Sequence, residues 1–509
     1  MRGKKATKNI FSSLLLQIVT IICGFIVPKL IIGKYGSNVN GLIVSITQFL
    51  AYITLLEAGF GPVVKAALYK PIANKNKSEI QNILKASENF FKKIGIIFIV
   101  YIIVLIFIYP SLVNSPFDRI STILLIIVIS ISTFAEYFFG MTYMLFLQAE
   151  QENYIISYIQ ILSKIINTIM IIVLIKFNCS IIFVKLISSL IFVLKPFIQN
   201  LYVKKKFEID LSKTDKGYEI KRKWDGLAQH IAYVIQTNTD TTVLAIFSSV
   251  SEVSVYSVYM LIINGIRNLI TAFSSGIEAT FGDMIAKNEK EKLKESFNLY
   301  EFLYYIIIDI ICISTMVLVI PFVKIYTKGI NDANYIRNSF AIIIILSEII
   351  YSIRKPYNSL VLAAGHFKET RRGAWVEAIS NIIISCILVF KYGIIGVAIG
   401  TLISVTIRTI EIIHYTSQNI LNRSDLEAYK KVLPMIVESI IIIYIFNNFI
   451  RIDVQSFFEL ILYSVVVVIV ATVIILLINL VINKDMIKKA FCKFTNIIHK
   501  GGNVWKHIL

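Results

Sequence analysis

The sequence predicts an all-α polytopic membrane protein with about 14 transmembrane helices. These form two six-helix lobes in a parallel pseudo-repeat, followed by two further C-terminal helices. Of the 509 residues, 56% are hydrophobic and 16% are charged, and the mean hydropathy is +0.74. No water-soluble domain of average composition approaches these values. Two further observations support this class, which are long apolar runs separated by basic segments and an internal repeat.

A window of about nineteen residues locates the apolar runs. The first run follows a basic start, but it is long enough to span a bilayer and lacks a small-residue cleavage site. We therefore interpret it as a retained first helix. The predicted spans are 10–32, 40–64, 94–114, 121–147, 154–175, 180–201, 227–248, 252–286, 299–323, 335–364, 377–391, 393–418, 433–450 and 456–482.

The distribution of basic residues predicts the orientation. The net charge is +19, and roughly 35 Lys and Arg fall on one side of the predicted membrane against about 7 on the other. This asymmetry predicts that the basic side is the cytoplasmic face and that both termini lie in the cytoplasm. Abundant Ile and an excess of Lys over Arg indicate a bacterial protein, so the expected location is a bacterial cytoplasmic membrane. The basic residues then face anionic lipid headgroups, so membrane lipids are expected partners and nucleic acid is not. The outer connections are short, which weighs against glycosyltransferases and polymerases.

An internal repeat orders the spans. A displacement of 215 residues places Gly61 on Gly276 and Lys176 on Lys391, and it aligns the first six spans with the next six. Six spans are an even number, so both lobes insert with the same orientation. Two parallel lobes predict a central cleft and transport by rocking. We predict an N-terminal lobe (1–205), a basic cytoplasmic linker (206–226), a C-terminal lobe (227–418), two added spans (433–482) and a basic cytoplasmic tail (483–509).

Seven consecutive polar residues, 236–242 (QTNTDTT), occupy the middle of the seventh span. An aspartate at a helix centre costs about 2.5–3.5 kcal/mol on insertion scales, so Asp240 needs a compensating environment. Gln236 and Asp240 are four residues apart and share a helix face. With Asn238, they are candidates for a polar cavity or an ion-coupling site. The alternative is an interhelical hydrogen-bond cluster that only holds the bundle together.

Other charged residues also fall within predicted spans. Arg267 is the most informative, because it lies mid-span and a guanidinium can bind a phosphate bidentately. By the 215-residue displacement its counterpart is Tyr52, so the polar residues are not symmetric between the lobes. Glu57 precedes AGFGP, where it could bind a coupling cation or simply mark a helix break. The remaining candidates are Lys29, Glu136, Lys164, Asp309 and Arg354.

Several motifs are absent from the sequence. There is no GxxxxGK[ST] phosphate loop, so ATP hydrolysis by that route is not expected. The histidines show no HExxH spacing and no cysteine accompanies them in a ligand pattern, so no metal site or cofactor is expected. The sequence therefore favours a transporter without a catalytic motif, driven by a Na⁺ or H⁺ gradient or by the substrate itself.

The chain resembles the Wzx-type polysaccharide flippases of the MOP superfamily, which includes MATE exporters and the lipid II flippase MurJ. The resemblance covers nearly the whole chain and is carried by three segments, which are the opening KKATKNIFSSLLLQIVTIICGFIVPKLIIGKYGSNVNG, NTDTTVLAIFSSVSEVSVYSVYMLI and KYGIIGVAIGTLIS. It implies an alternately opening cationic cavity, with the added pair of spans forming a groove for a lipid tail. Members place basic residues in the second and eighth spans. Arg267 fits, but the second span offers Glu57 and no Arg, which favours a glycan other than lipid II.

The resemblance implies an undecaprenyl-diphosphate-linked oligosaccharide as cargo, moved from the cytoplasmic to the outer leaflet for capsule, O-antigen or exopolysaccharide synthesis. A polysaccharide polymerase and its chain-length machinery would then be partners. The diphosphate would be held by Arg267, Lys29, Lys164 and Arg354. The polar or ion-coupling residues would be Asp240, Asn238, Gln236, Glu57, Glu136 and Asp309. The alternatives are a cation-coupled multidrug exporter of MATE type and, third, a membrane glycosyltransferase or polymerase.

Overall fold

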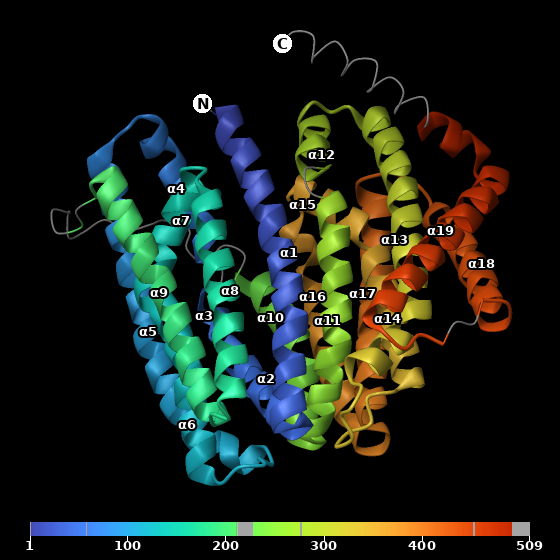
Figure 1. Ribbon diagram of the computed structural model, residues 1–509. Helices are drawn as coiled ribbons and strands as arrows, with labels where there is room; N and C mark the ends of the chain where they lie inside the picture. Colours follow the sequence, from blue (N-terminus) through green and yellow to red (C-terminus); the bar gives the residue numbers. More distant parts are fainter. Residues whose placement is uncertain are drawn as a thin grey trace. The chain divides into compact units, whose positions relative to one another are not determined.

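The computed structural model describes residues 2–57, 59–209, 211, 227–274, 277–450 and 453–490. Throughout these residues the regular structure is helical (Figure 1). The contacts divide the chain into two compact units. Unit 1 comprises Met1–Leu261, Gly329–Asn334 and Cys386–Val397, and unit 2 comprises Ile262–Lys328, Tyr335–Ser385 and Ala398–Leu509. The predicted linker and tail lie largely outside the described residues, and the predicted lobe boundaries stay a prediction.

Unit 1 is built around the N-terminal helices. Helix α1 packs on α8, α6 packs on α9, and α2 packs on α10. Helix α11 begins in this unit. The helices are α1 (Arg2–Tyr35), α2 (Ser37–Ala51), α3 (Thr54–Glu57), α4 (Phe60–Ala73), α5 (Lys77–Leu112), α6 (Arg119–Ala135), η1 (Glu136–Gly140), α7 (Met141–Ala149), α8 (Asn153–Lys176), α9 (Ile181–Phe207), α10 (Leu227–Phe247) and α11 (Val250–Ser274).

Unit 2 is organised around the long helix α13. Helices α14, α18 and α19 pack against it, and α12 packs on α15. A core of buried Ile, Val and aromatic side chains joins α13, α18 and α19. The helices are α12 (Ile277–Ala286), α13 (Lys290–Tyr326), α14 (Asn338–Ile353), α15 (Lys355–Ala364), α16 (Phe367–Tyr392), α17 (Ile394–Asn419), α18 (Leu426–Asn448) and α19 (Phe457–Ile482).

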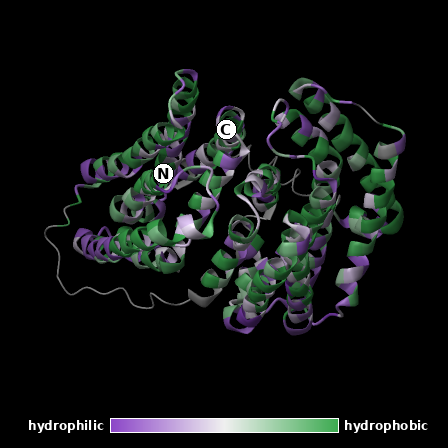
Figure 2. Cartoon of the chain, turned by 90° about the horizontal axis from the view of Figure 1, so that it is seen from below, coloured by the Kyte–Doolittle hydropathy of each residue, from purple (hydrophilic) through white to green (hydrophobic). Residues whose placement is uncertain are grey.

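The helices have the length and polarity of a multi-pass membrane protein. Within the described ranges, 11 helical segments are long and apolar enough to cross a bilayer. Large apolar side chains such as Phe107 and Ile461 lie exposed along them, as expected where the solvent is lipid, and hydrophobic residues predominate along the helices (Figure 2). Three further predicted spans are helical without meeting this criterion. They are α10, which is polar, α14–α15, which is interrupted, and α18, which carries charged residues.

Four predicted spans are not single continuous α-helices. The second, 40–64, breaks at Gly59, whose φ of 77° is a left-handed conformation that favours glycine. The tenth, 335–364, breaks at Arg354, because Pro356 has no N–H to continue the helical hydrogen bonds. The fourth, 121–147, contains the π-helical segment η1. The eighth, 252–286, is divided into α11 and α12, and residues 275–276 between them lie outside the described ranges.

The internal repeat is visible in the helix bounds. Displaced by 215 residues, α5 covers 292–327, where α13 runs from Lys290 to Tyr326. Displaced equally, α8 covers 368–391, where α16 runs from Phe367 to Tyr392. The break between η1 and α7 likewise recurs near the break between α14 and α15. The pseudo-repeat predicted from the sequence is therefore confirmed at the level of secondary structure.

Candidate functional site

The polar centre of the seventh span lies on α10 inside unit 1. Its side chains and their neighbours on α2 and α11 form a cluster that we call the α10 seam, which consists of Gln48, Tyr52, Asn238, Asp240, Thr242 and Tyr256. Asn238 and Asp240 are buried, and Gln236 is half-buried. These polar side chains therefore contact protein rather than lipid, which offsets the free-energy cost of inserting them into the membrane.

Hydrogen bonds connect the α10 seam to both neighbouring helices. The Gln48 amide of α2 donates to Asn238 Oδ1, and Tyr52 Oη lies 2.9 Å from Thr242 Oγ1. From α11, the Tyr256 hydroxyl donates to Asp240 Oδ2 over 3.0 Å. The polar run thus serves at least in part as interhelical hydrogen bonding, which is the alternative that the sequence left open.

Helices α2 and α11 approach each other closely beside the α10 seam. A Cβ atom built on Gly41 would lie 1.6 Å from the backbone oxygen of Val250, so only glycine fits there. Next to it, the Asn40 amide donates to Ser254 Oγ over 2.8 Å. A residue without a side chain and two short polar ones allow this crossing, as is common between membrane helices.

The other candidate residues of unit 1 are distributed over several helices. The Tyr137 hydroxyl donates to Glu57 Oε2 over 3.2 Å. Lys195 Nζ lies 3.4 Å from Glu136 Oε2, forming an ion pair. Lys164 on α8 interacts electrostatically with Lys195 and with Cys23. Lys29 is half-buried on α1.

Arg267 lies in unit 2 at the centre of a group of charged side chains. Its Nε donates to Glu348 Oε2 over 2.8 Å. The guanidinium carbon also lies 5.0 Å from the ring centre of Tyr351. Arg354 contacts the same ring at 4.5 Å, and Lys355 at 4.9 Å. Three cations therefore surround one aromatic ring, an arrangement favoured by the negative face of the ring.

Two carboxylates partly balance these cations. Arg354 Nη1 lies 2.7 Å from Glu377 Oε1, and both side chains are about 95% buried (5% and 6% exposed). Arg267 is more accessible, with 35% of its side chain exposed. We call this group the Arg267 cluster, and it consists of Arg267, Glu348, Tyr351, Arg354, Lys355 and Glu377. It contains three cations and two carboxylates, so it carries an excess of positive charge beside one reachable guanidinium.

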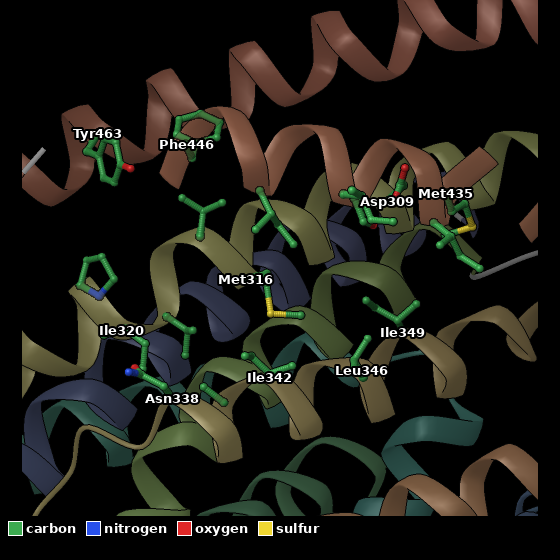
Figure 3. A pocket seen from close by; sticks show the side chains of 18 of the residues that line it. Asp309, Met316, Ile320, Asn338, Ile342, Leu346, Ile349, Met435, Phe446 and Tyr463 are labelled. Carbon is green, nitrogen blue, oxygen red and sulfur yellow. The ribbon is translucent and has the colours of Figure 1, made fainter. Parts of the chain in front are cut away.

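A cavity of about 870 Å³ lies elsewhere in unit 2, between α13, α14 and α18. Its walls are largely Ile, Val and Met side chains (Figure 3). Asp309 lies near Met435 at one end, and Tyr463 and Phe446 lie at the other. The carboxyl group of Asp309 interacts with that of Glu438, which also accepts a 2.7 Å hydrogen bond from Asn479. Asp309 is thus separate from the Arg267 cluster in its contacts.

Helix α14 joins the cavity to the Arg267 cluster. Its residues Ile342, Leu346 and Ile349 recur at helical spacing on the wall of the cavity. Tyr351 lies two residues after Ile349, which places it on nearly the opposite side of the helix. One helix therefore presents an apolar cavity on one side and a cationic group on the other.

The structure brings some predicted site residues together and not others. Arg267 and Arg354 share the Tyr351 ring, whereas Lys29 and Lys164 lie on α1 and α8 of unit 1. Sequence reasoning missed Tyr351, Glu348 and Glu377. The two glutamates fall within predicted spans, so the rule that selected Arg267 could have selected them. Tyr351 precedes Arg354 and Lys355 by three and four residues, a spacing that predicts one shared face on a continuous helix, although the helix breaks at Arg354.

A second buried group of charges was also missed. The Arg423 guanidinium donates to both oxygens of Glu301, at 3.0 Å each, and to the Tyr357 hydroxyl at 2.8 Å. Lys431 forms another ion pair with Glu301. The side chains of Arg423 and Glu301 are fully buried. This group ties the loop before α18 to α13 and α15, and its closed geometry indicates a structural role.

Comparisons with known proteins establish the fold. No protein-family model and no curated protein matches this chain. Among solved structures it is similar to the lipid II flippase MurJ in an inward closed conformation, with a TM-score of 0.69 and 15% identity over 94% of this chain and 99% of that one. It is also similar to an inward-facing MATE multidrug transporter of the MOP superfamily, with a TM-score of 0.61 and 15% identity over 80% of this chain and 94% of that one. A third similar structure is a Vibrio cholerae MATE transporter, with a TM-score of 0.56 and 14% identity over 83% of this chain and 99% of that one. The chain therefore has a MOP-type fold.

Proposed function

We propose that this protein is a flippase that moves undecaprenyl-diphosphate-linked oligosaccharides from the cytoplasmic to the outer leaflet of a bacterial membrane, for polysaccharide synthesis. The observation that carries the proposal is the Arg267 cluster. Three cations around Tyr351, of which Arg267 and Lys355 are only half-buried, form a site suited to a multiply charged phosphate group. Arg267 binds the diphosphate, while Arg354 and Lys355 contribute positive potential behind it.

The apolar cavity supports a lipid-linked cargo. It lies on the other side of α14 from the Arg267 cluster, and Ile436 and Ile440 on its α18 wall are exposed where lipid would surround the protein. A prenyl tail occupies this cavity while the diphosphate binds the cluster. The likeness to MurJ over 94% of this chain supports the same assignment.

A flippase must keep the polar part of its cargo out of hydrocarbon. Each unsatisfied polar group in the bilayer core costs several kcal/mol, so sugars cross in a water-filled space lined by protein. Asp240, Asn238, Gln236, Glu57 and Glu136 offer hydrogen bonds to sugar hydroxyls or a site for a coupling Na⁺ or H⁺. In this proposal both termini are cytoplasmic, and the polymerase receives the cargo at the outer leaflet.

The test measures the rate at which a fluorescent undecaprenyl-diphosphate oligosaccharide is flipped in proteoliposomes. The rate is obtained from the fraction of the label that a quencher reaches in the outer leaflet. We expect Arg267→Ala to slow flipping at least about tenfold, because a charge-assisted hydrogen bond contributes about 1.5–3 kcal/mol. Arg119→Ala removes an exposed arginine at the start of α6 and is the matched control. Flipping no faster than in empty liposomes, or equal rates for wild type and Arg267→Ala, would refute the proposal.

A second candidate is a cation-coupled drug exporter, favoured by the likeness to MATE transporters. Such a protein would bind organic cations, for which the acidic residues of unit 1 are better suited than the Arg267 cluster. Uptake of a fluorescent cationic drug into everted vesicles separates the two. Drug transport that depends on Asp240 or Glu57 and not on Arg267 would favour the exporter.

A further inference from the structure

The ion pair between Arg267 and Glu348 is unequal in its exposure. The Arg267 side chain is 35% exposed, whereas that of Glu348 is 1% exposed. A ligand can therefore reach the cation, and the carboxylate stays enclosed. Glu348 uses only Oε2 in the pair, and its buried Oε1 has no hydrogen-bond partner among the described residues. Arg267 is therefore the main stabilising partner of the carboxylate, and Lys355 and Arg354 contribute less.

The groups around Glu348 come from four helices. Arg267 reaches it from α11, and Arg354 and Lys355 approach from the junction between α14 and α15. From α13, Tyr304 and Cys312 interact with it electrostatically, and Cys312 interacts with Asp309 as well. The Tyr304 hydroxyl is buried and has no hydrogen-bond partner in the described part of the chain. Arg267 is the only cation among the described residues that forms an ion pair with Glu348 within 4 Å.

We propose that Glu348 binds a proton whenever a diphosphate binds Arg267, and releases that proton when the diphosphate leaves. This inference rests on the proposed function, because it assigns the coupling of the same site. In the unoccupied site the Arg267 guanidinium is balanced by the Glu348 carboxylate. When a phosphate oxygen accepts the hydrogen bond of the Arg267 guanidinium in place of Glu348, one proton from water adds to the Glu348 carboxylate. No other covalent bond of the protein or the diphosphate changes. When the diphosphate departs, the proton returns to water and the ion pair forms again.

The physical reason is the cost of an isolated buried charge. A carboxylate that loses its partner in a low-dielectric site becomes neutral rather than staying ionised. The neighbouring pair of Arg354 and Glu377 differs, because both of its side chains are buried and no ligand reaches the cation. The proposal therefore concerns Glu348 and excludes Glu377, although both are buried glutamates paired with arginine.

The experiment measures protons taken up per ligand bound. Undecaprenyl diphosphate is titrated calorimetrically into the purified full-length protein in detergent, in buffers that differ in ionisation enthalpy. Inorganic pyrophosphate is titrated in a second series, which tests the anion without the lipid. A diphosphate itself exchanges protons on binding, so the readout is the difference between wild type and Glu348→Gln. We expect that difference to be about one proton, with Glu348→Gln binding at least as tightly as wild type.

The variant Glu88→Gln, which removes a carboxylate paired with Lys85 and Lys92 on α5, is the matched control, and its proton count should equal that of wild type. Unchanged elution and thermal midpoint show that each variant is folded. An infrared band of a protonated carboxyl group, appearing on addition of the probe in wild type and missing in Glu348→Gln, provides a second readout. Equal proton counts in wild type and Glu348→Gln overturn this inference and leave the proposed function standing. Failure of wild type to bind undecaprenyl diphosphate overturns both.

Discussion

The α10 seam and the Arg267 cluster are both groups of polar residues in membrane helices, but they differ in how those residues are stabilised. In the seam, side chains of α10 meet hydrogen-bonding partners on α2 and α11, such as Gln48 and Tyr256. In the cluster, cations outnumber carboxylates, and the Arg267 side chain is 35% exposed. The difference teaches that polarity alone does not identify a binding site. An excess of charge beside an accessible side chain does.

If the α10 seam is primarily structural, disturbing its helix crossing should have the largest effect on stability. Gly41→Ala places a methyl group on the Val250 carbonyl, so α2 and α11 must separate, at a cost of about 3 kcal/mol. We expect a clearly lower thermal midpoint in detergent. Gly24→Ala is the control, since nothing lies within 4 Å of its added Cβ. Equal midpoints for the two variants would contradict the close crossing.

Removing the ring from the Arg267 cluster should affect both binding and stability. Tyr351→Leu deletes the aromatic face that three cations share, each contact contributing about 0.5–2 kcal/mol. We expect affinity for undecaprenyl diphosphate to fall about 3-fold to 30-fold, because the cations are no longer held together. The midpoint of thermal unfolding should also fall, because the same contacts stabilise the folded protein. Tyr351→Phe keeps the ring and should bind like wild type, and a large loss there would assign the role to the hydroxyl group.

The smallest effect is expected at Asp240. Asp240→Asn keeps an oxygen that accepts the hydrogen bond from Tyr256. The free energy of unfolding should therefore change by about 1 kcal/mol or less, with a small shift of the thermal midpoint. Flipping in proteoliposomes, measured with and without a Na⁺ or pH gradient, decides the role of the residue. Unchanged flipping under every gradient identifies the α10 seam as structural. If Asp240→Asn abolishes only the dependence of flipping on the gradient, the α10 seam is not merely structural and Asp240 is a coupling residue.

Much of the fold could be predicted from the sequence for two reasons. Each apolar run is long, and a run found in one half predicts a matching run 215 residues away in the other half. The interruptions were harder to predict. The AGFGP segment indicated a break near Gly59, but Pro356 occurs in a run that hydropathy scores as continuous, and a window of about nineteen residues averages over a single break. The breaks depend on backbone geometry, which local composition reports only weakly.

The candidate site was predicted less completely for a different reason. Arg267 is conspicuous as a charge in an apolar run, but its partner Glu348 lies 81 residues away in the chain. Tyr351 is an aromatic residue in a protein rich in aromatic residues, and only its position between cations gives it a role. Contacts between helices decide such assignments, and a single sequence does not contain them.

The constant 215-residue offset between the halves has an experimental consequence. Because the helix bounds nearly coincide after one displacement, the helices of the two halves differ mainly by substitution, with little insertion or deletion inside them. Each position therefore has a counterpart at the same place in the backbone of the other half. Tyr52 occupies in the first half the place of Arg267 in the second. Exchange of residues between such counterparts changes a side chain while keeping its place in the helix, so the two halves serve as controls for each other.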